Sequence, residues 1–519
     1  MGTLQPGYLF PGDLESDTFR VEVDAHPTPV SSIPSLARSD YAAAAAEYKK
    51  FKEPCWIDPP RFMGVHYALL EADGPASVTV TCPAAVRSCI VHPLRREVKA
   101  TVDGSRVTLH IGQTQPRYYI VEIDDYPPLV LIVDATETAA PLRDGSDVLD
   151  IGALVTDSST VAERTAAFHR AFAEASKTGK TVFVPAGVYH VNALKFHNLD
   201  GLKVYFAAGS LIRTEVSPTG KNIHSHGLWF QDSKNIHISG RGCLDHQGFG
   251  NFGHGRNAYD HGLISYYVTN DLCPFTTESP VFMLRCANVT MEGFMVRNGR
   301  NMNFNIRRCD DITFRNCKIL TPPASSPEYT DGFHTNSCRN VLIENCLAFC
   351  NDDCFASGHY TYFDDRDSGP HTIRGLVGWN VRANGIRLGF HTYYNLGDYA
   401  FEGCDFAGIT WRGLMVHPLK DAWEAGRYQR YGTVTLTNCG FDCARLSGEL
   451  IEVDGARMQA LELKECVFDQ KGSIRIRGHD AAGLVNIVEL QNVSIDGRKI
   501  TSIADTGVET HFVGDIKVS

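Results

Sequence analysis

Hydrophobic and polar positions alternate in short runs along much of this chain. Between about residues 55 and 140 the runs "ASVTVTC", "EVKATVDGSRVTLHI", "RYYIVEI" and "LVLIVD" follow one another, with "DGS" as a turn signal. Alternation at every second position, interrupted by turn residues, is typical of β-strands. We therefore expect a small β-sandwich at 55–140, after an N-terminal extension at 1–54 that is irregular apart from a short helix in "DYAAAAAEYKKF".

The pattern changes near residue 147, where a single amphipathic helix is predicted. Thr160 and Glu163 have the spacing of a capping box, and Gly179 marks the end of the helix. One face of this helix carries the apolar residues Phe168, Ala171, Phe172 and Ala175. The strand "TVFVP" follows, so the helix is expected to cover the first coil of whatever fold comes next.

A short phrase then recurs to the end of the chain, as in "DITFRNC", "NVLIENC", "TVTLTNC" and "ALELKEC". The copies align at Ile238, Met291, Phe314, Ile343, Ile373, Phe401, Leu436, Leu463 and Leu490, mostly at intervals in the high twenties. Each copy offers one strand and then Asn or Gly for a turn, and a unit this short cannot bury its own apolar face. Stacked copies form a parallel β-helix, which we expect over 147–519.

Five cysteines share one phase of this repeat, namely Cys317, Cys346, Cys404, Cys439 and Cys466. A shared phase places them in one interior column, where reduced thiols pack as small apolar groups. No pair has the spacing of a zinc site, so no metal is expected from the cysteines.

Three aspartates stand out because they are separated by about one coil. Asp331 lies in "EYTDGF", and Asp352 and Asp353 lie in "FCNDDCF", each at a loop after a strand-sized run. Residues one coil apart are neighbours at about 5 Å, so we expect the three carboxylates to meet on one face. Adjacent acids at a turn are often only solvated, but the third carboxylate at one-coil spacing favours a functional cluster.

Clustered carboxylates repel one another, which raises the pKa of at least one of them. One protonated and two ionised acids suit glycoside hydrolysis, in which an acid protonates the leaving oxygen and a base activates water. For an inverting enzyme we expect Asp352 to lie about 6.5–9.5 Å from Asp331. The alternative chemistry is Ca²⁺ binding for a polysaccharide lyase, since oxygen clusters hold hard cations.

The motifs "YTDGF", "NDDC" and "NGIRLG" resemble the TDG, DDC and RIK signatures of polygalacturonases, glycoside hydrolase family 28. The paired and single aspartates, with a β-sandwich before the helix, are also similar to family 49, the dextranases and isopullulanases. The resemblance implies a right-handed parallel β-helix and inversion. It also implies Asp352 as the general acid, with Asp331 and Asp353 holding and deprotonating the water.

The chain departs from the polygalacturonase pattern at the substrate-binding signature. Arg387 is followed by Leu388 and Gly389, so the lysine of the Arg-x-Lys motif is missing, and the position of the family's Gly-His-Gly histidine is not matched. In the family the Arg-x-Lys motif binds the substrate carboxylate. We therefore expect a neutral glycan rather than galacturonate.

Other residues near the aspartates are candidates for binding sugar, although a loop histidine is often merely solvated and an aromatic ring is more often packed. The candidates are Arg387, His359, His334, His391, Tyr360 and Trp379. Arg387 is expected to contact a sugar hydroxyl or to adjust Asp352, or else to form a structural ion pair.

Composition excludes several classes of partner. The formal net charge of −11 is spread along the chain, which argues against nucleic acid, and no apolar run is long enough to cross a membrane. The first residues lack the regions of a signal peptide, so we expect a cytoplasmic protein, with a secreted mature form as the alternative.

Three functions remain open on the sequence. An inverting glycoside hydrolase without a cofactor, acting on a carbohydrate, accounts for the three aspartates. A Ca²⁺-dependent lyase or epimerase on the same fold would be sensitive to EDTA. A carbohydrate-binding β-helix without catalysis would keep its sugar affinity after loss of all three aspartates.

Overall fold

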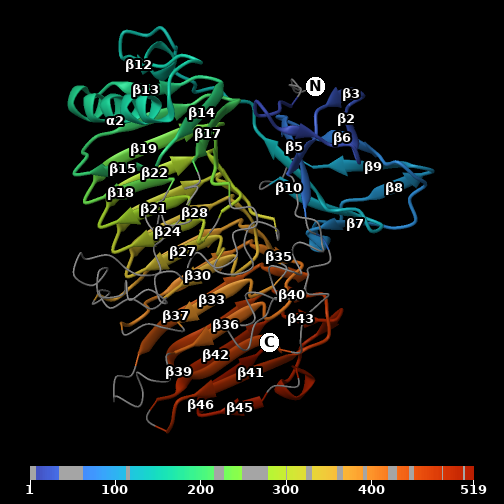
Figure 1. Cartoon of the computed structure of the whole chain (residues 1–519). Coiled ribbons are helices and arrows are strands. Elements are labelled where there is room, and N and C mark those ends of the chain that lie inside the picture. The colour runs from blue at the N-terminus through green and yellow to red at the C-terminus, as the bar shows by residue number, and fades with distance from the viewer. Residues whose placement is uncertain are drawn as a thin grey trace, which may run out of the picture.

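The structure is a computed structural model that shows a long β-helix with a β-sandwich packed against its side (Figure 1). It describes residues 7–33, 62, 64–112, 117–215, 227–247, 279–299, 301–322, 330–358, 366–380, 382–389, 394–418, 429–442, 449–481, 483–506 and 509–519. The chain is all-β apart from one long helix and three short 3₁₀ turns among these residues, and its β-helix is of the right-handed parallel kind.

Each coil of the β-helix contributes strands to three parallel sheets, which we call sheets C, D and E. Sheet C contains β12 (Val148–Asp150), β13 (Thr181–Val184), β16 (Lys203–Phe206), β19 (Lys234–Gly240), β22 (Ala287–Glu292), β25 (Asp310–Arg315), β28 (Arg339–Glu344), β31 (His371–Arg374), β34 (Tyr399–Glu402), β37 (Arg430–Thr437), the end of β39 (Glu449–Lys464), β42 (Val485–Gln491) and β46 (Val513–Val518).

Sheet D contains β14 (Gly187–Val191), β17 (Ser210–Thr214), β20 (Cys243–Asp245), β23 (Met295–Arg297), β26 (Lys318–Leu320), β29 (Leu347–Cys350), β32 (Val377–Asn380), β35 (Asp405–Ala407), β38 (Gly440–Asp442), β40 (Val467–Phe468), β43 (Ser494–Ile495) and β44 (Arg498–Lys499), of which β44 pairs antiparallel. Sheet E contains β15 (Leu194–His197), β18 (Leu228–Gln231), β21 (Val281–Leu284), β24 (Phe304–Arg307), β27 (Phe333–Asn336), β30 (Phe355–Ser357), β33 (Ile386–Gly389), β36 (Leu414–His417), the start of β39, β41 (Ser473–Gly478) and β45 (Glu509–His511).

The repeat phase deduced from the sequence matches the register of sheet C. Ile238 pairs with Met291, Met291 with Phe314, and Phe314 with Ile343, and the pairing continues through the same aligned positions to Leu490. These side chains are buried in one continuous core. The apolar position of each copy therefore fixes how the coils stack.

The five cysteines lie in the expected interior column. All are fully buried, and each thiol donates to a main-chain carbonyl of the preceding coil, as Cys346 does to Phe314 O at 3.7 Å. The residue before each cysteine turns the chain with a positive φ. Asn316, Asn345 and Asn438 have φ between 48° and 52°, a left-handed conformation that Asn and Gly adopt at low cost.

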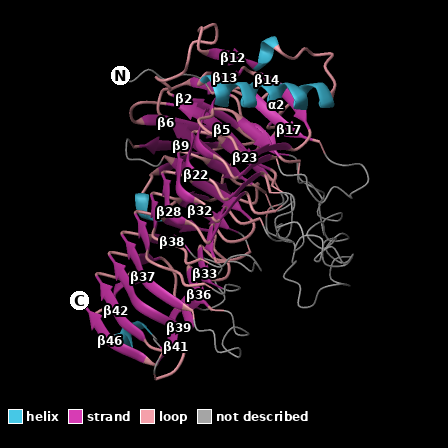
Figure 2. Ribbon diagram, turned by 90° about the vertical axis from the view of Figure 1, so that its left-hand side faces the viewer, coloured by secondary structure: helices cyan, strands magenta, loops and turns pink. Residues whose placement is uncertain are grey.

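Helix α2 (Val161–Thr178) covers the first coils, as Figure 2 shows. Thr160 and Glu163 form the predicted capping box, and Gly179 ends the helix with a φ of 73°. The predicted apolar face is buried against the first coils of the β-helix. No helix among the described residues combines the length and apolar composition needed to cross a membrane.

The β-sandwich has two mostly antiparallel sheets. One contains β1 (Leu14–Glu15), β4 (Ser31–Ile33), β5 (Val65–Glu71), β11 (Leu129–Asp134), β10 (Tyr118–Ile123) and β7 (Cys89–His92), and the other β3 (His26–Thr28), β2 (Arg20–Val23), β6 (Ala76–Thr81), β9 (Arg106–Ile111) and β8 (Ala100–Asp103). The stretch expected to be irregular thus supplies four strands. The predicted Ala-rich helix lies outside the described residues. The three 3₁₀ turns are η1 (Leu94–Arg96), η2 (Ile151–Ala153) and η3 (Ile503–Thr506).

The first sheet of the sandwich packs on the outer face of sheet D. Tyr67, Tyr118 and Ile120 contact a row of outward side chains that includes Phe349 and Trp379. Both faces of sheet D are therefore covered, which explains why its central strands, such as β26 and β29, are buried at every position, whereas the sheet C strand β25 alternates between buried and more exposed residues. The aspartates lie at the corner between sheets D and E, which is part of the β-helix.

Candidate active site

The three aspartates lie in the turns that lead from sheet D to sheet E. Asp331 lies two residues before β27, and Asp353 lies two residues before β30. Phe333 pairs with Phe355, so Asp331 and Asp353 occupy the same position in successive coils. The main-chain nitrogen of Gly332 donates to Asp353 O at 2.8 Å. The expected one-coil proximity is confirmed.

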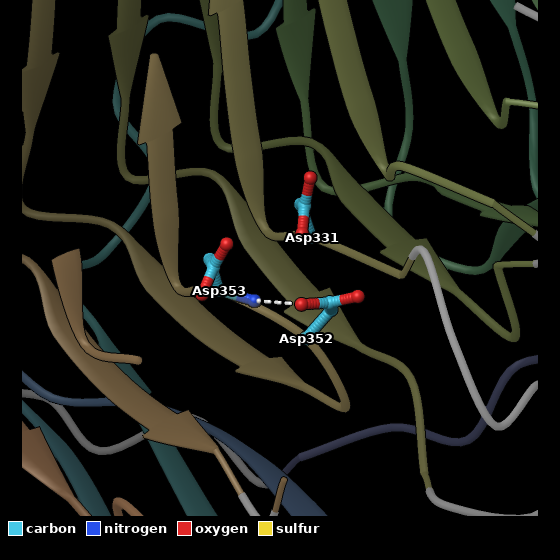
Figure 3. A group of neighbouring side chains, drawn as sticks. All are labelled: Asp331, Asp352 and Asp353. Atoms are coloured by element: carbon cyan, nitrogen blue, oxygen red, sulfur yellow. Dashed lines mark hydrogen bonds between the residues drawn. The ribbon is translucent and has the colours of Figure 1, made fainter. Parts of the chain in front are cut away.

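The three carboxylates point toward a common space, as Figure 3 shows. One oxygen of each lies within 4.8 Å of the corresponding oxygens of the other two. The expected distance of about 6.5–9.5 Å between Asp352 and Asp331 is therefore wrong for these oxygens. Adjacent coils bring the side chains closer than that range because strand spacing is only about 4.8 Å.

The three aspartates differ in exposure. Asp331 and Asp353 are each 1% exposed, whereas Asp352 is partly exposed. The main-chain nitrogen of Asp353 donates to Asp352 Oδ1 at 3.0 Å, which orients the Asp352 carboxylate (Figure 3). Asp352 is thus the member of the cluster that solvent, and a bound molecule, can reach.

Asp353 is surrounded by hydrogen-bond donors. Its Oδ1 accepts from the main-chain nitrogen of Asn384 at 3.0 Å and from the Asn384 side-chain amide at 2.7 Å. Its Oδ2 forms an ion pair with the guanidinium of Arg387. Both carboxylate oxygens are therefore held by the next coil, in which Asn384 and Arg387 lie.

Asp331 has a different environment. Its Oδ2 lies in hydrogen-bond contact with His334 Nδ1 and 3.8 Å from the nearer Arg387 nitrogen. Burial, and then the neighbouring charge of Asp353, raise the pKa of Asp331 to about 7, although Arg387 opposes the shift. Burial and the Arg387 charge lower the pKa of His334 well below its usual range. The Asp331 and His334 pair therefore binds one proton near neutral pH, and His334 contacts the cluster rather than solvent.

Arg387 forms an ion pair, which is one of the alternatives expected for it. Its side chain is 10% exposed and contacts Asp353 and Asp331, so it belongs to the aspartate cluster. A contact with a sugar hydroxyl stays a prediction. Burial by itself would lower the pKa of Arg387, but the two carboxylates raise it above its ordinary value. The buried cation offsets part of the repulsion among the aspartates.

Trp379 does not lie where sugar binding would need it. It is 1% exposed, stacks on Phe349 with ring centroids 5.9 Å apart, and meets His92 of the sandwich edge to face at 5.2 Å. It belongs to the contact between the two domains, a role that its position on sheet D determines. The remaining sugar-binding candidates, His359, Tyr360 and His391, lie outside the described residues.

The position after Arg387 that matches the family lysine is closed. Gly389 has a φ of 91°, and a Cβ there would collide with the Tyr431 hydroxyl and the carbonyl of His417. No lysine fits at this position, so a substrate carboxylate has no partner at that point of the chain.

Asn384 is the functional candidate that the sequence argument missed. It was noted only as the first residue of "NGIRLG". The signal that would have found it is its coil position, because Phe355 pairs with Ile386 and Asn384 therefore stands in register with Asp353. To predict that register one must know the lengths of the turns, which the sequence repeat alone does not give.

Comparison with known proteins supports the sequence resemblance. Residues 175–365, which include all three aspartates, match the family model described as Glycosyl hydrolases family 28. Polygalacturonase QRT2 of Arabidopsis thaliana is 23% identical over 140 residues, which are 27% of this chain and 29% of that protein. An exopolygalacturonase of Platanus acerifolia is 25% identical over 252 residues, 47% of this chain and 59% of that protein. The chain thus spans less than two thirds of these curated relatives.

Similarity to solved structures extends over nearly the whole chain. Dex49A from Penicillium minioluteum superposes with a TM-score of 0.55 and 12% identity, covering 99% of this chain and 96% of that protein. At this identity the likeness concerns the fold, a β-helix of the same kind.

Proposed function

We propose that this chain is a glycoside hydrolase that cleaves a polysaccharide containing galacturonic acid. The observation that carries the proposal is that Asp331, Asp352 and Asp353 converge within the segment that matches family 28. Clustered acids with unequal environments are the machinery that hydrolysis of a glycosidic bond needs.

The substrate proposal replaces the neutral glycan that the missing lysine had predicted. The family match and the relatives named polygalacturonases favour galacturonate instead. The closed position at Gly389 means that a substrate carboxylate would be recognised by other groups than in the Arg-x-Lys motif.

Asp352 is proposed as the proton donor because it is the exposed member of the cluster. Asp331 lies beside it and binds a proton up to about pH 7, so it can resupply Asp352 between turnovers. Asp353, held by Arg387 and Asn384, is proposed as the base that deprotonates water. Asp331 was expected to share that role, and its raised pKa instead favours proton storage.

A single water molecule can bridge Asp331 and Asp353. A water that hydrogen-bonds to two carboxylate oxygens at about 2.8 Å each spans oxygens that lie up to about 5 Å apart. The oxygens of these carboxylates lie within 4.8 Å of one another. Attack by a water held in this way would invert the anomeric centre, which we propose as the stereochemical course.

The test compares the wild type with Asp352→Asn and with the exposed Asp103→Asn as a control. Reducing ends are measured on polygalacturonate, dextran, pullulan and arabinan. We expect cleavage of polygalacturonate, a loss of about 10²–10⁴-fold in kcat for Asp352→Asn with little change in KM, and normal activity for Asp103→Asn. NMR of the first product should show inversion.

Other outcomes would favour other functions. Near-normal turnover by Asp352→Asn, or retained configuration, would refute the assignment of roles. An unsaturated product and inhibition by EDTA would indicate a lyase. Sugar binding without any product, unchanged after loss of all three aspartates, would indicate a binding protein.

A further inference from the structure

The turns before the strands of sheet E carry a column of residues in register. Phe333, Phe355 and Ile386 pair with one another in successive coils. Asp331, Asp353 and Asn384 each lie two residues earlier, so each is the neighbour of the next at the strand spacing of about 4.8 Å. The column thus places an amide on the side of Asp353 that faces away from Asp331.

Asn384 donates twice to one oxygen of Asp353. Its main-chain nitrogen lies 3.0 Å and its side-chain Nδ2 2.7 Å from Asp353 Oδ1. With the Arg387 ion pair at Oδ2, both carboxylate oxygens are engaged from one coil. Such a clamp leaves the carboxylate one orientation.

Asn384 is itself fixed. Its carbonyl accepts from Cys354 N at 3.2 Å and from Asn380 Nδ2 at 3.2 Å. It is 1% exposed, and a Cβ on the following Gly385 would lie 2.9 Å from Gly413 O, so the next coil packs tightly against this turn. A side chain so enclosed acts on Asp353 and not on substrate.

We propose that Asn384 is a positioning residue that keeps Asp353 aimed at the attacking water. The proposal rests on the hydrolase function proposed above. The proposal gives the two buried aspartates different roles, because Asp331 contacts His334 and has no comparable amide clamp among the described residues. A base must be both ionised and aligned to accept a proton, so the clamp should affect turnover more than substrate affinity.

The experiment uses Asn384→Ala and the isosteric Asn384→Asp. Asn298→Asp is a matched control, because Asn298 Nδ2 donates to buried Asp245 at 2.9 Å and Arg297 also contacts that carboxylate, which is none of the three aspartates of the site. Steady-state kinetics on the cleaved substrate are measured across pH, with circular dichroism and melting temperature to verify folding.

We expect Asn384→Ala to lower kcat about 10–100-fold and to change KM less than about threefold. Asn384→Asp should have a larger effect in the same direction, because it places a further carboxylate beside Asp353 and repels it. Asn298→Asp should lower the melting temperature without lowering kcat.

Several results would overturn the proposal. They are a normal kcat in folded Asn384→Ala, a change confined to KM, or an equal loss of kcat in Asn298→Asp. If the wild type is active and Asn384→Ala is normal, only this inference fails. If the wild type cleaves none of the substrates tested, the proposed function and this inference fail together.

Discussion

Replacing Asp331 by Asn should stabilise the protein at neutral and alkaline pH while abolishing most of its activity. Asp331 is buried, and its charged form is opposed first by burial and then by Asp353. Asn has nearly the same shape, and its amide can donate to His334 Nδ1, which contacts Asp331 in the wild type. The substitution therefore removes the cost of a buried charge and retains a hydrogen bond.

The magnitude follows from the raised pKa. A carboxyl with an ordinary pKa of 3.8 and a folded value of about 7 contributes fully below pH 3.8 and loses that contribution as pH rises to about 7. Between about pH 5 and pH 8 the wild type loses about 2–3 kcal/mol through this group, at 1.36 kcal/mol per pKa unit. Unfolding roughly 370 residues at about 2.1 cal/mol/K each gives about 0.8 kcal/mol/K, so the loss corresponds to about 3 °C.

The assay is the melting temperature of Asp331→Asn and wild type at several pH values. The difference between them should increase by about 3 °C from about pH 5 to pH 8, in favour of the variant. Asp103→Asn, an exposed change on β8, should show no such trend. A difference that stays constant or falls with pH would mean that Asp331 is not a destabilising charge, and the proposed proton storage would be wrong.

Two further predictions concern other buried charges. Burial would lower the pKa of His92, but its hydrogen bond to Asp442 and a second acid raise it to about 9, so its contribution is present below pH 6.5 and is lost as pH rises through about 9. His92→Gln should lower the melting temperature at pH 6 and have less effect at pH 10, and equal effects at both would contradict this. Arg387→Met should cost about 3–5 kcal/mol by leaving Asp353 without its cation, whereas the half-exposed Arg374→Met should cost less than about 1 kcal/mol, as thermal unfolding will show.

The fold could be predicted from the sequence because the positions of the apolar residues define the repeat. Phe314 and Ile343 could be aligned by eye, and they pair in the sheet because a shift of one residue would turn the apolar side chains outward. The capping box of α2 is equally local. Contacts between distant segments were harder to predict from the sequence. The strands within residues 14–33, for example, join the sandwich only through pairing with β5 and β6.

Side-chain roles at the site were predicted less well than their location. Asp331 and Asp353 were placed together from their spacing, but their distance depends on strand separation and turn geometry. Arg387 was predicted to lie near them. Whether its side chain points toward Asp353 depends on which face of β33 it occupies. Trp379 looked suitable for sugar stacking because nothing in its own segment indicates that a second domain covers sheet D.

The order of residues along the column explains why two similar aspartates acquire different chemistry. Met302 lies two residues before β24 and so precedes Asp331 in the column, with Asp353 and then Asn384 beyond. Asp331 thus has a buried apolar neighbour on one side and a like charge on the other, and both raise its pKa. Asp353 has a donor on its far side. In a stacked fold each residue is surrounded largely by the coils above and below it, so the order apolar, acid, acid, amide raises the pKa of the first acid and places a hydrogen-bond donor beside the second.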